Sequence, residues 1–132
     1  MSVREDLERA IEYFCALNTK DIDAVAALEA FLELRNALET GMVRAAEPDV
    51  TSFSGWRVNA WVKRGILLGY RLGTLQSMNG EHAAGESILS FVEKSTFPVR
   101  HWCPANGVRI VPGGSSVRSG AHLAAGVIVA PP

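Results

Sequence analysis

The sequence has little of what secreted, membrane-spanning or nucleotide-binding proteins require. Its 132 residues include only two cysteines, Cys15 and Cys103, so it has no disulfide framework and we expect a reducing compartment. No apolar run approaches the ~18 residues of a membrane span. Residues 1–13 alternate charged and apolar side chains and lack the apolar core of a signal peptide. The phosphate-binding patterns GxGxxG and GxxxxGK[ST] are absent. These absences predict a cytoplasmic protein without a membrane segment.

Charge of one sign is not in excess either. The chain has 13 basic and 14 acidic residues and a net charge of −1, which argues against a nucleic-acid partner. The distribution is uneven, because residues 1–40 are acidic and residues 41–132 carry the basic excess. The second region is where we expect an anionic ligand, and the alternative is ordinary solvated helices followed by a mixed domain.

The content that is present, 48% hydrophobic and 20% charged residues, is typical of one soluble globular domain. Ser2 and Glu5 have capping-box spacing, and they precede an apolar stripe of helical period at Leu7, Ile11, Phe14 and Leu17. A second helix is predicted over residues 21–40, with an inward face at Val25, Leu28 and Leu32, and Phe31 as a further inward candidate. Gly41 stands where a helix end favours positive φ.

Residues 42–46 fit a short strand, and residues 47–55 have the composition of a loop. The segment 57–72 predicts a third helix whose buried stripe comprises Val58, Trp61, Val62, Leu68 and Leu72. The four-residue spacing of Gly65 and Gly69 is compatible with close helix packing. Residues 73–86 are rich in turn formers, and residues 87–102 fit either a strand or a short helix.

The end of the chain has the most specific pattern. Aliphatic residues recur every six positions, and smaller ones follow the first three at a spacing of four: Val111, Val117, Leu123 and Val129, with Ser115, Ala121 and Val127. This is the hexapeptide pattern of a β-helix, in which each hexad forms one strand and one turn of a triangular coil. The glycines suit the turns and oppose a helix. Three hexads complete one coil, so a longer chain or a second chain is expected to cover its open end.

Three stretches, in order, carry a family resemblance. They are ALETGMVRAAE at 37–47, GWRVNAWVKRGILLGYRLG at 55–73 and VRIVPGGSSVRSGAHLAAGVIVAPP at 108–132. The chain resembles the N-terminal part of tetrahydrodipicolinate N-succinyltransferase, an enzyme of lysine and diaminopimelate biosynthesis.

The resemblance implies an α+β fold. A helical hairpin and a small α/β domain over residues 1–106 would precede the first coil of a left-handed parallel β-helix over residues 107–132. It also implies a homotrimer that transfers succinyl from succinyl-CoA to the amine of ring-opened tetrahydrodipicolinate. Neither a metal nor a tightly bound cofactor is implied, and succinyl-CoA is the co-substrate. The family's catalytic acidic residues lie beyond residue 132, so no catalytic residue is expected within this chain and the chain alone is expected to be inactive.

One substrate-binding residue is carried over, Arg109 in the V-R-I-V-P motif. A guanidinium stays charged and holds a carboxylate through two hydrogen bonds, whereas the structural alternative is an ion pair at the domain junction. Arg118, in V-R-S-G-A, is expected to point outward and to form a surface or intersubunit ion pair.

Other chemical constellations are incomplete. His82, His101 and His122 lack metal-ligand spacing, and His101 with Cys103 gives at most two of the three or four ligands that zinc needs. His122 should face outward and has no identifiable carboxylate partner for general-base work. Cys15 fits core packing, and Cys103 has no identifiable base that would make it a nucleophile.

Two other function classes stay open: a different hexapeptide-repeat acyltransferase, and a non-enzymatic interaction module.

Overall fold

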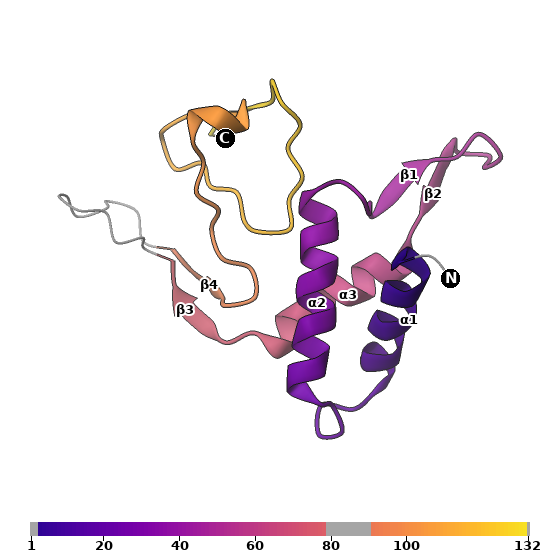
Figure 1. The fold of residues 1–132 in the computed structure, drawn as a ribbon. Coiled ribbons are helices and arrows are strands. Elements are labelled where there is room, and N and C mark those ends of the chain that lie inside the picture. Colours follow the sequence, from indigo (N-terminus) through magenta and orange to yellow (C-terminus); the bar gives the residue numbers. More distant parts are fainter. Residues whose placement is uncertain (1–2, 79–90, 132) are drawn as a thin grey trace. The chain divides into compact units, whose positions relative to one another are not determined.

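The computed structural model describes residues 3–78 and 91–131. The chain divides into two compact units, Met1–Leu72 and Gly73–Pro132, and each is described by itself (Figure 1). The first unit contains α1 (Val3–Ala16), α2 (Ala24–Glu39), β1 (Ala46–Pro48), β2 (Trp56–Val58) and α3 (Ala60–Leu72). The second contains β3 (Leu75–Ser77), β4 (Val92–Lys94), the 3-10 turn η1 (Pro104–Asn106), β5 (Arg109–Ile110) and β6 (Ile128–Val129). The protein is thus a small α/β chain with three α-helices and short sheets among its described residues.

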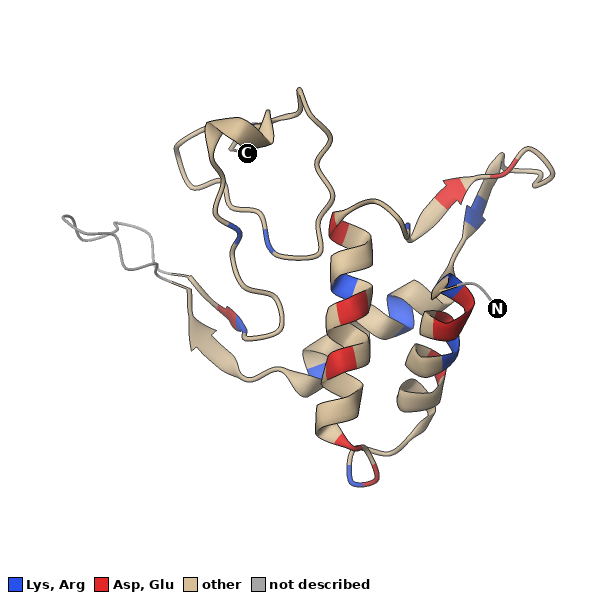
Figure 2. Ribbon diagram, viewed as in Figure 1, with Lys and Arg blue, Asp and Glu red and all other residues tan. Residues whose placement is uncertain are grey.

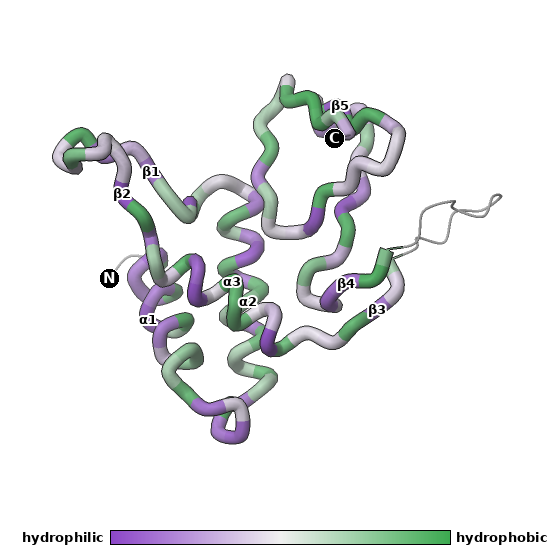
Figure 3. The backbone as a smooth tube through the Cα atoms, turned by 180° about the vertical axis from the view of Figure 1, so that it is seen from behind, coloured by the Kyte–Doolittle hydropathy of each residue, from purple (hydrophilic) through white to green (hydrophobic). Residues whose placement is uncertain are grey.

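The first helix follows its predicted stripe except at Leu17, which lies beyond the helix end at Ala16. Leu7 and Ile11 are buried, and Phe14 packs against the same core. The predicted cap at Ser2 lies outside the described residues. Acidic residues recur along α1 and α2 (Figure 2), and apolar positions alternate with polar ones along all three helices (Figure 3). The period-3.6 pattern therefore places this helix correctly.

The second helix is where the sequence predicted, but its inward face is different. Asp23 caps it, because its Oδ1 accepts hydrogen bonds from the amides of Val25 and Ala26 at 3.0 and 3.2 Å. The buried positions are Ala27, Ala30, Phe31, Leu34 and Ala37. The prediction for Val25, Leu28 and Leu32 is wrong, since these side chains are 69%, 38% and 38% exposed. Phe31 is the one predicted position that is buried.

The reason for the error is that α2 has two stripes of helical spacing. The prediction chose the face with the larger aliphatic side chains. The face that is buried includes three alanines, whose small side chains let the neighbouring helices approach more closely. The helix ends as predicted, because Gly41 has φ 77° and its amide donates to the carbonyl of Leu38 at 3.1 Å.

The third helix buries Trp61, Val62 and Leu68, as predicted, while Leu72 packs partly against the core. The prediction for Val58 is wrong: it lies in strand β2 and is 72% exposed. Asn59 separates the strand from the helix, and its Nδ2 donates to the carbonyl of Arg44 at 2.7 Å. This buried turn explains why the helix starts three residues later than the apolar pattern indicated.

The predicted close approach at Gly65 and Gly69 is confirmed. A Cβ at Gly65 would overlap the Leu34 side chain and lie 3.0 Å from Ile11 Cγ2. A Cβ at Gly69 would overlap the ring of Phe31. The two glycines therefore form the groove of α3 into which side chains of α1 and α2 pack.

A β-hairpin connects α2 to α3. β1 and β2 pair antiparallel, with Ala46 opposite Val58 and Pro48 opposite Trp56. The strand predicted over residues 42–46 is wrong except at Ala46, and the loop predicted over residues 47–55 is shortened by the first strand. At the tip, Asp49 Oδ1 accepts from the amide of Thr51 at 2.9 Å, and Gly55 has φ 74°.

In the second unit, β3 and β4 also pair antiparallel, with Leu75 opposite Lys94. The predicted turn-rich segment 73–86 contains this first strand, and its residues 79–86 lie outside the described residues. For residues 87–102 the strand alternative holds in the described part, at Val92–Lys94.

At the end of the chain, β5 and β6 pair in parallel, with Arg109 opposite Ile128 and Ile110 opposite Val129. Residues 111–127, between these strands, contain neither a helix nor another strand. The amides of Arg109 and Val111 donate to the carbonyls of Val127 and Val129 at 3.0 and 2.9 Å. The segment is therefore not a helix or a hairpin, whereas a regular β-helix stays a prediction.

Burial in this segment follows the hexads. The seven positions of the two hexapeptide series, 111, 117, 123 and 129 with 115, 121 and 127, are all partly buried. The residues between these positions are exposed, except for Ser119 and Gly120, which are also partly buried. The division of the chain at residues 106 and 107 also stays a prediction.

Candidate functional site

The predicted substrate-binding residue lies beside an open concavity within the second unit. A hollow of about 520 Å³ is lined by Trp102, Cys103, Pro104, Gly107, Val108, Arg109 and Ile110. The 3-10 turn and the following Gly107, which has φ 64°, redirect the chain from Trp102 into strand β5. Local turn chemistry thus places an indole, a thiol and a guanidinium around one hollow.

Arg109 is held by its backbone while its side chain stays available. Its amide bonds to Val127 in the parallel pair, and the residue is exposed. Its guanidinium makes no hydrogen bond or ion pair with any residue that the structure describes. An arginine of this kind can offer two parallel N–H groups to a carboxylate.

Trp102 is a wall of the same hollow and was not singled out by the sequence reasoning. The guanidinium carbon of Arg100 lies 4.1 Å from its ring centroid, and Arg100 Nη1 donates to the carbonyl of Ala121 at 2.8 Å. The indole Nε1 is buried and has no hydrogen-bond acceptor among the described residues. The spacing of Arg100 and Trp102, two residues apart in an extended segment, places them on one face and was the signal available.

Arg118 is exposed, as predicted, and pairs with Glu93. Its guanidinium carbon also lies 6.0 Å from the ring centroid of Phe97. A hydrogen bond from the backbone amide of Lys94 is the largest cause that lowers the pKa of Glu93, and the hydrogen bond from Arg118 lowers it further. Arg118 is therefore engaged within its own unit, which fits the surface ion pair expected of it.

The remaining predicted groups are dispersed. His101, Cys103 and His122 are exposed, whereas His82 lies outside the described residues. No group of three potential metal-ligating side chains occurs in residues 3–78 and 91–131. Within the same ranges, no helix has both the length and the apolar character of a membrane span.

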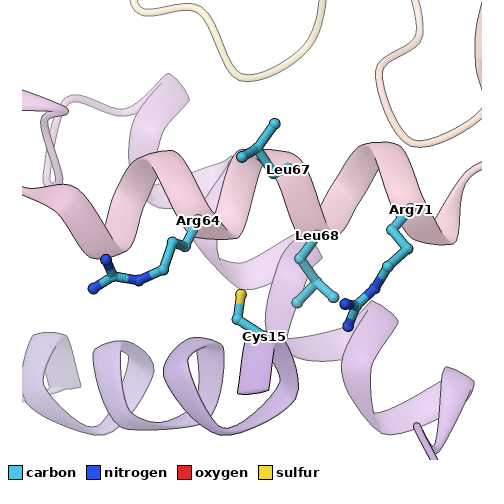
Figure 4. A pocket seen from close by; sticks show the side chains of 5 residues that line it. All are labelled: Cys15, Arg64, Leu67, Leu68 and Arg71. Carbon is cyan, nitrogen blue, oxygen red and sulfur yellow. The ribbon is translucent and has the colours of Figure 1, made fainter. Parts of the chain in front are cut away.

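A second hollow, of about 230 Å³, lies in the first unit between α1 and α3 (Figure 4). It is lined by Cys15, Arg64, Leu67, Leu68 and Arg71. Burial, the largest cause, raises the pKa of the Cys15 thiol, so the reactive thiolate is disfavoured. Arg64 pairs with Glu12, and Arg71 donates to the carbonyl of Phe14 at 2.9 Å. Both cations thus have partners in the fold, and Cys15 fits the packing role predicted for it.

Comparison with known proteins connects this architecture to a family. Residues 3–72 match the family model described as tetrahydrodipicolinate N-succinyltransferase N-terminal, a range that corresponds to the first compact unit. Three relatives share the name 2,3,4,5-tetrahydropyridine-2,6-dicarboxylate N-succinyltransferase. The relative from Granulibacter bethesdensis is 33% identical over 97% of this chain and 44% of its own length. The relative from Paracoccus denitrificans is 36% identical over 80% of this chain and 36% of its own length. The relative from Xylella fastidiosa is 34% identical over 73% of this chain and 33% of its own length.

The fold and these matches define the chain first as the N-terminal domain of a transferase family. It belongs to the tetrahydrodipicolinate N-succinyltransferase family. The chain spans less than half of the length of these three relatives.

Proposed function

We propose that the chain is the N-terminal part of an acyltransferase that moves a succinyl group from succinyl-CoA to the amine of ring-opened tetrahydrodipicolinate. The carrying observation is the family match over residues 3–72, together with relatives of this name that align with 97% of the chain. The activity would serve lysine and diaminopimelate biosynthesis in the cytoplasm, with succinyl-CoA as a co-substrate and no resident cofactor.

The proposed reaction is an acyl transfer. Water adds across the imine of the cyclic substrate, with oxygen on carbon and a proton on nitrogen, and the carbon–nitrogen bond then breaks to leave a ketone and a primary amine. That amine attacks the thioester carbonyl, an amide bond forms, the carbon–sulfur bond breaks, and the amine proton is lost as CoA leaves as its thiol. Residues beyond position 132 are expected to supply the proton-transfer groups.

The part assigned to this chain is substrate orientation by Arg109. Its exposed guanidinium lies beside a hollow of about 520 Å³ and has no partner among the described residues. A carboxylate held by two hydrogen bonds would fix the direction in which the amine approaches the thioester. Positioning of this kind lowers a barrier through proximity, and a small misplacement costs about 100-fold in rate.

The C-terminal segment is proposed as the first coil of a left-handed β-helix. The parallel pairing of β5 with β6 and the partial burial of all seven hexad positions, with most of the residues between them exposed, support this proposal. One coil leaves an aliphatic layer and a backbone edge uncovered, and further coils with two more subunits of a homotrimer would cover them. The chain alone is therefore proposed to be inactive.

A chimera tests the function. The chain replaces the aligned 44% of the Granulibacter relative, and CoA release from succinyl-CoA is followed with and without tetrahydrodipicolinate. We expect turnover by the chimera and none by the 132-residue chain alone. A chimera that acylates a different amine favours another hexapeptide acyltransferase. An inactive chimera, with a 132-residue chain that binds the intact relative, favours the interaction module.

Arg109→Lys in the active chimera tests the orienting role. It keeps the charge and loses the two-pronged geometry, so the KM for the dicarboxylate should rise much more than the KM for succinyl-CoA. Arg109→Ala should cost more, about 1.5–3 kcal/mol for a charge-assisted hydrogen bond. Arg44→Ala, at an exposed position of the first unit, is the matched control and should change neither KM.

A further inference from the structure

The hollow beside Arg109 has an aromatic wall, which the binding of a carboxylate does not by itself require. Trp102 lines it, and the Arg100 guanidinium, 4.1 Å from the ring centroid, restricts its position. A guanidinium recognises a carboxylate whether the rest of the ligand is a ring or an open chain. An indole held in place instead favours a ligand with a rigid apolar surface.

The Trp102 side chain also has an unmet hydrogen bond. Its Nε1 is buried without an acceptor among the described residues, an arrangement that is unfavourable for an indole. Because this atom is buried, a ligand in the open hollow would not reach it while the ring keeps its position. The apolar surface of the indole, and not its donor, is therefore the property that complements a ring that bears carboxylates.

We propose that Trp102 adapts the Arg109 site to the cyclic form of the dicarboxylate, so that the ring binds here before water opens it. This inference rests on the proposed function, in which Arg109 holds a carboxylate of the same ligand. Trp102 is then a specificity-determining residue. It discriminates a six-membered ring with two carboxylates from an open chain with the same number of carbons between them.

The test is calorimetric titration of the 132-residue chain with two stable probes. Pyridine-2,6-dicarboxylate contains the ring, and heptanedioate has the same seven-carbon path without it. We expect Trp102→Ala to weaken the ring ligand about threefold to tenfold, the range of an aromatic contact. It should weaken heptanedioate less than about twofold on the same grounds. Trp102→Phe should restore most of the ring affinity, and Trp56→Ala, an exposed tryptophan of the first unit, should change neither.

The cysteines give an independent readout in the same chain. Cys103 lines the hollow and is exposed, whereas Cys15 is half-buried in the first unit. Saturating pyridine-2,6-dicarboxylate should slow alkylation of Cys103 by iodoacetamide, measured by peptide mass spectrometry. Alkylation of Cys15 should keep its rate. Trp102→Ala should abolish most of the protection at a fixed ligand concentration.

The outcomes separate this inference from the proposed function. Equal weakening of both probes by Trp102→Ala, or no weakening of either, overturns the inference while Arg109 remains the carboxylate contact. Arg109→Ala should weaken both probes by about tenfold or more. If it weakens neither, the carboxylate contact of the proposed function fails. A wild-type chain that binds neither probe overturns the inference, whereas the chimera assay decides the proposed function. Far-UV and near-UV circular dichroism of each variant identifies any that fails to fold.

Discussion

The two compact units use different means to order their chains. Among the described residues, every buried hydrophobic side chain except Phe97 belongs to the unit Met1–Leu72. There, three helices bury a shared stripe and approach one another at glycines. In Gly73–Pro132 the strands have two or three residues each, and the hexad positions are only partly buried. The comparison teaches that the first unit has its own core, whereas the second arranges exposed groups around a hollow.

The largest expected effect comes from the core of the first unit. Phe31→Ala removes a fully buried ring from α2 and should lower the free energy of unfolding by about 3–5 kcal/mol. Leu32→Ala, next to it on the outward face and 38% exposed, should cost far less. Urea denaturation monitored by helical circular dichroism measures both. Equal costs for the two variants would contradict the inward face assigned to α2.

The next effect tests the glycine groove of α3. Alanine normally stabilises a helix relative to glycine by about 1 kcal/mol, yet a Cβ at Gly69 would overlap the Phe31 ring. Gly69→Ala should therefore destabilise the protein by about 1–3 kcal/mol. The combination with Phe31→Leu, which vacates part of the space, should cost less than the sum of the two single substitutions. A stabilised Gly69→Ala protein would show that the helices are not packed this closely.

A smaller, pH-dependent effect is expected at the base of the hairpin. Two arginine hydrogen bonds lower the pKa of Glu47 to about 2; the one from Arg57 contributes most and the one from Arg4 comes next. Arg4 Nη2 lies 3.0 Å from Glu47 Oε1. Because the folded pKa lies below the ordinary value of 4.5, the stabilisation is complete above pH 4.5 and declines as the pH falls towards 2. Glu47→Gln should remove this part of the acid dependence, measured by urea midpoints between pH 2.5 and 6. An unchanged profile would exclude Glu47 as its source.

The smallest effect is expected in the second unit. Arg118→Ala removes an ion pair with Glu93 whose two side chains are 46% and 26% exposed, and such pairs contribute little to global stability. Hydrogen exchange should nevertheless rise at the amides of Arg100 and Ser119, which bond across the same segment to Val117 and Pro98. Exchange within α1, α2 and α3 should keep its rate. A uniform rise in both units would contradict their separate stabilisation.

Several features could be predicted from local sequence because local physics dominates them. The first helix follows a single apolar stripe, and Gly41 ends the second helix with positive φ. The hexad positions are all partly buried, and most of the residues between them are exposed. The family resemblance was likewise visible in three segments, and the match over residues 3–72 confirms it. Arg109 was named from its motif, and its role as a substrate contact stays a prediction.

Other features depended on contacts between residues distant in sequence. The α2 sequence has two stripes of helical period, and only the neighbouring helices select the alanine-rich face, since small side chains permit their close approach. Val58 fits a helical stripe, yet strand pairing with Ala46 places it in the hairpin. Trp102 became part of the candidate site because the η1 turn and Gly107 bring strand β5 back beside it. Sequence alone determined the period of each element and the family; tertiary structure decided which face is buried and which side chains share the hollow, because both depend on packing partners that no local pattern encodes.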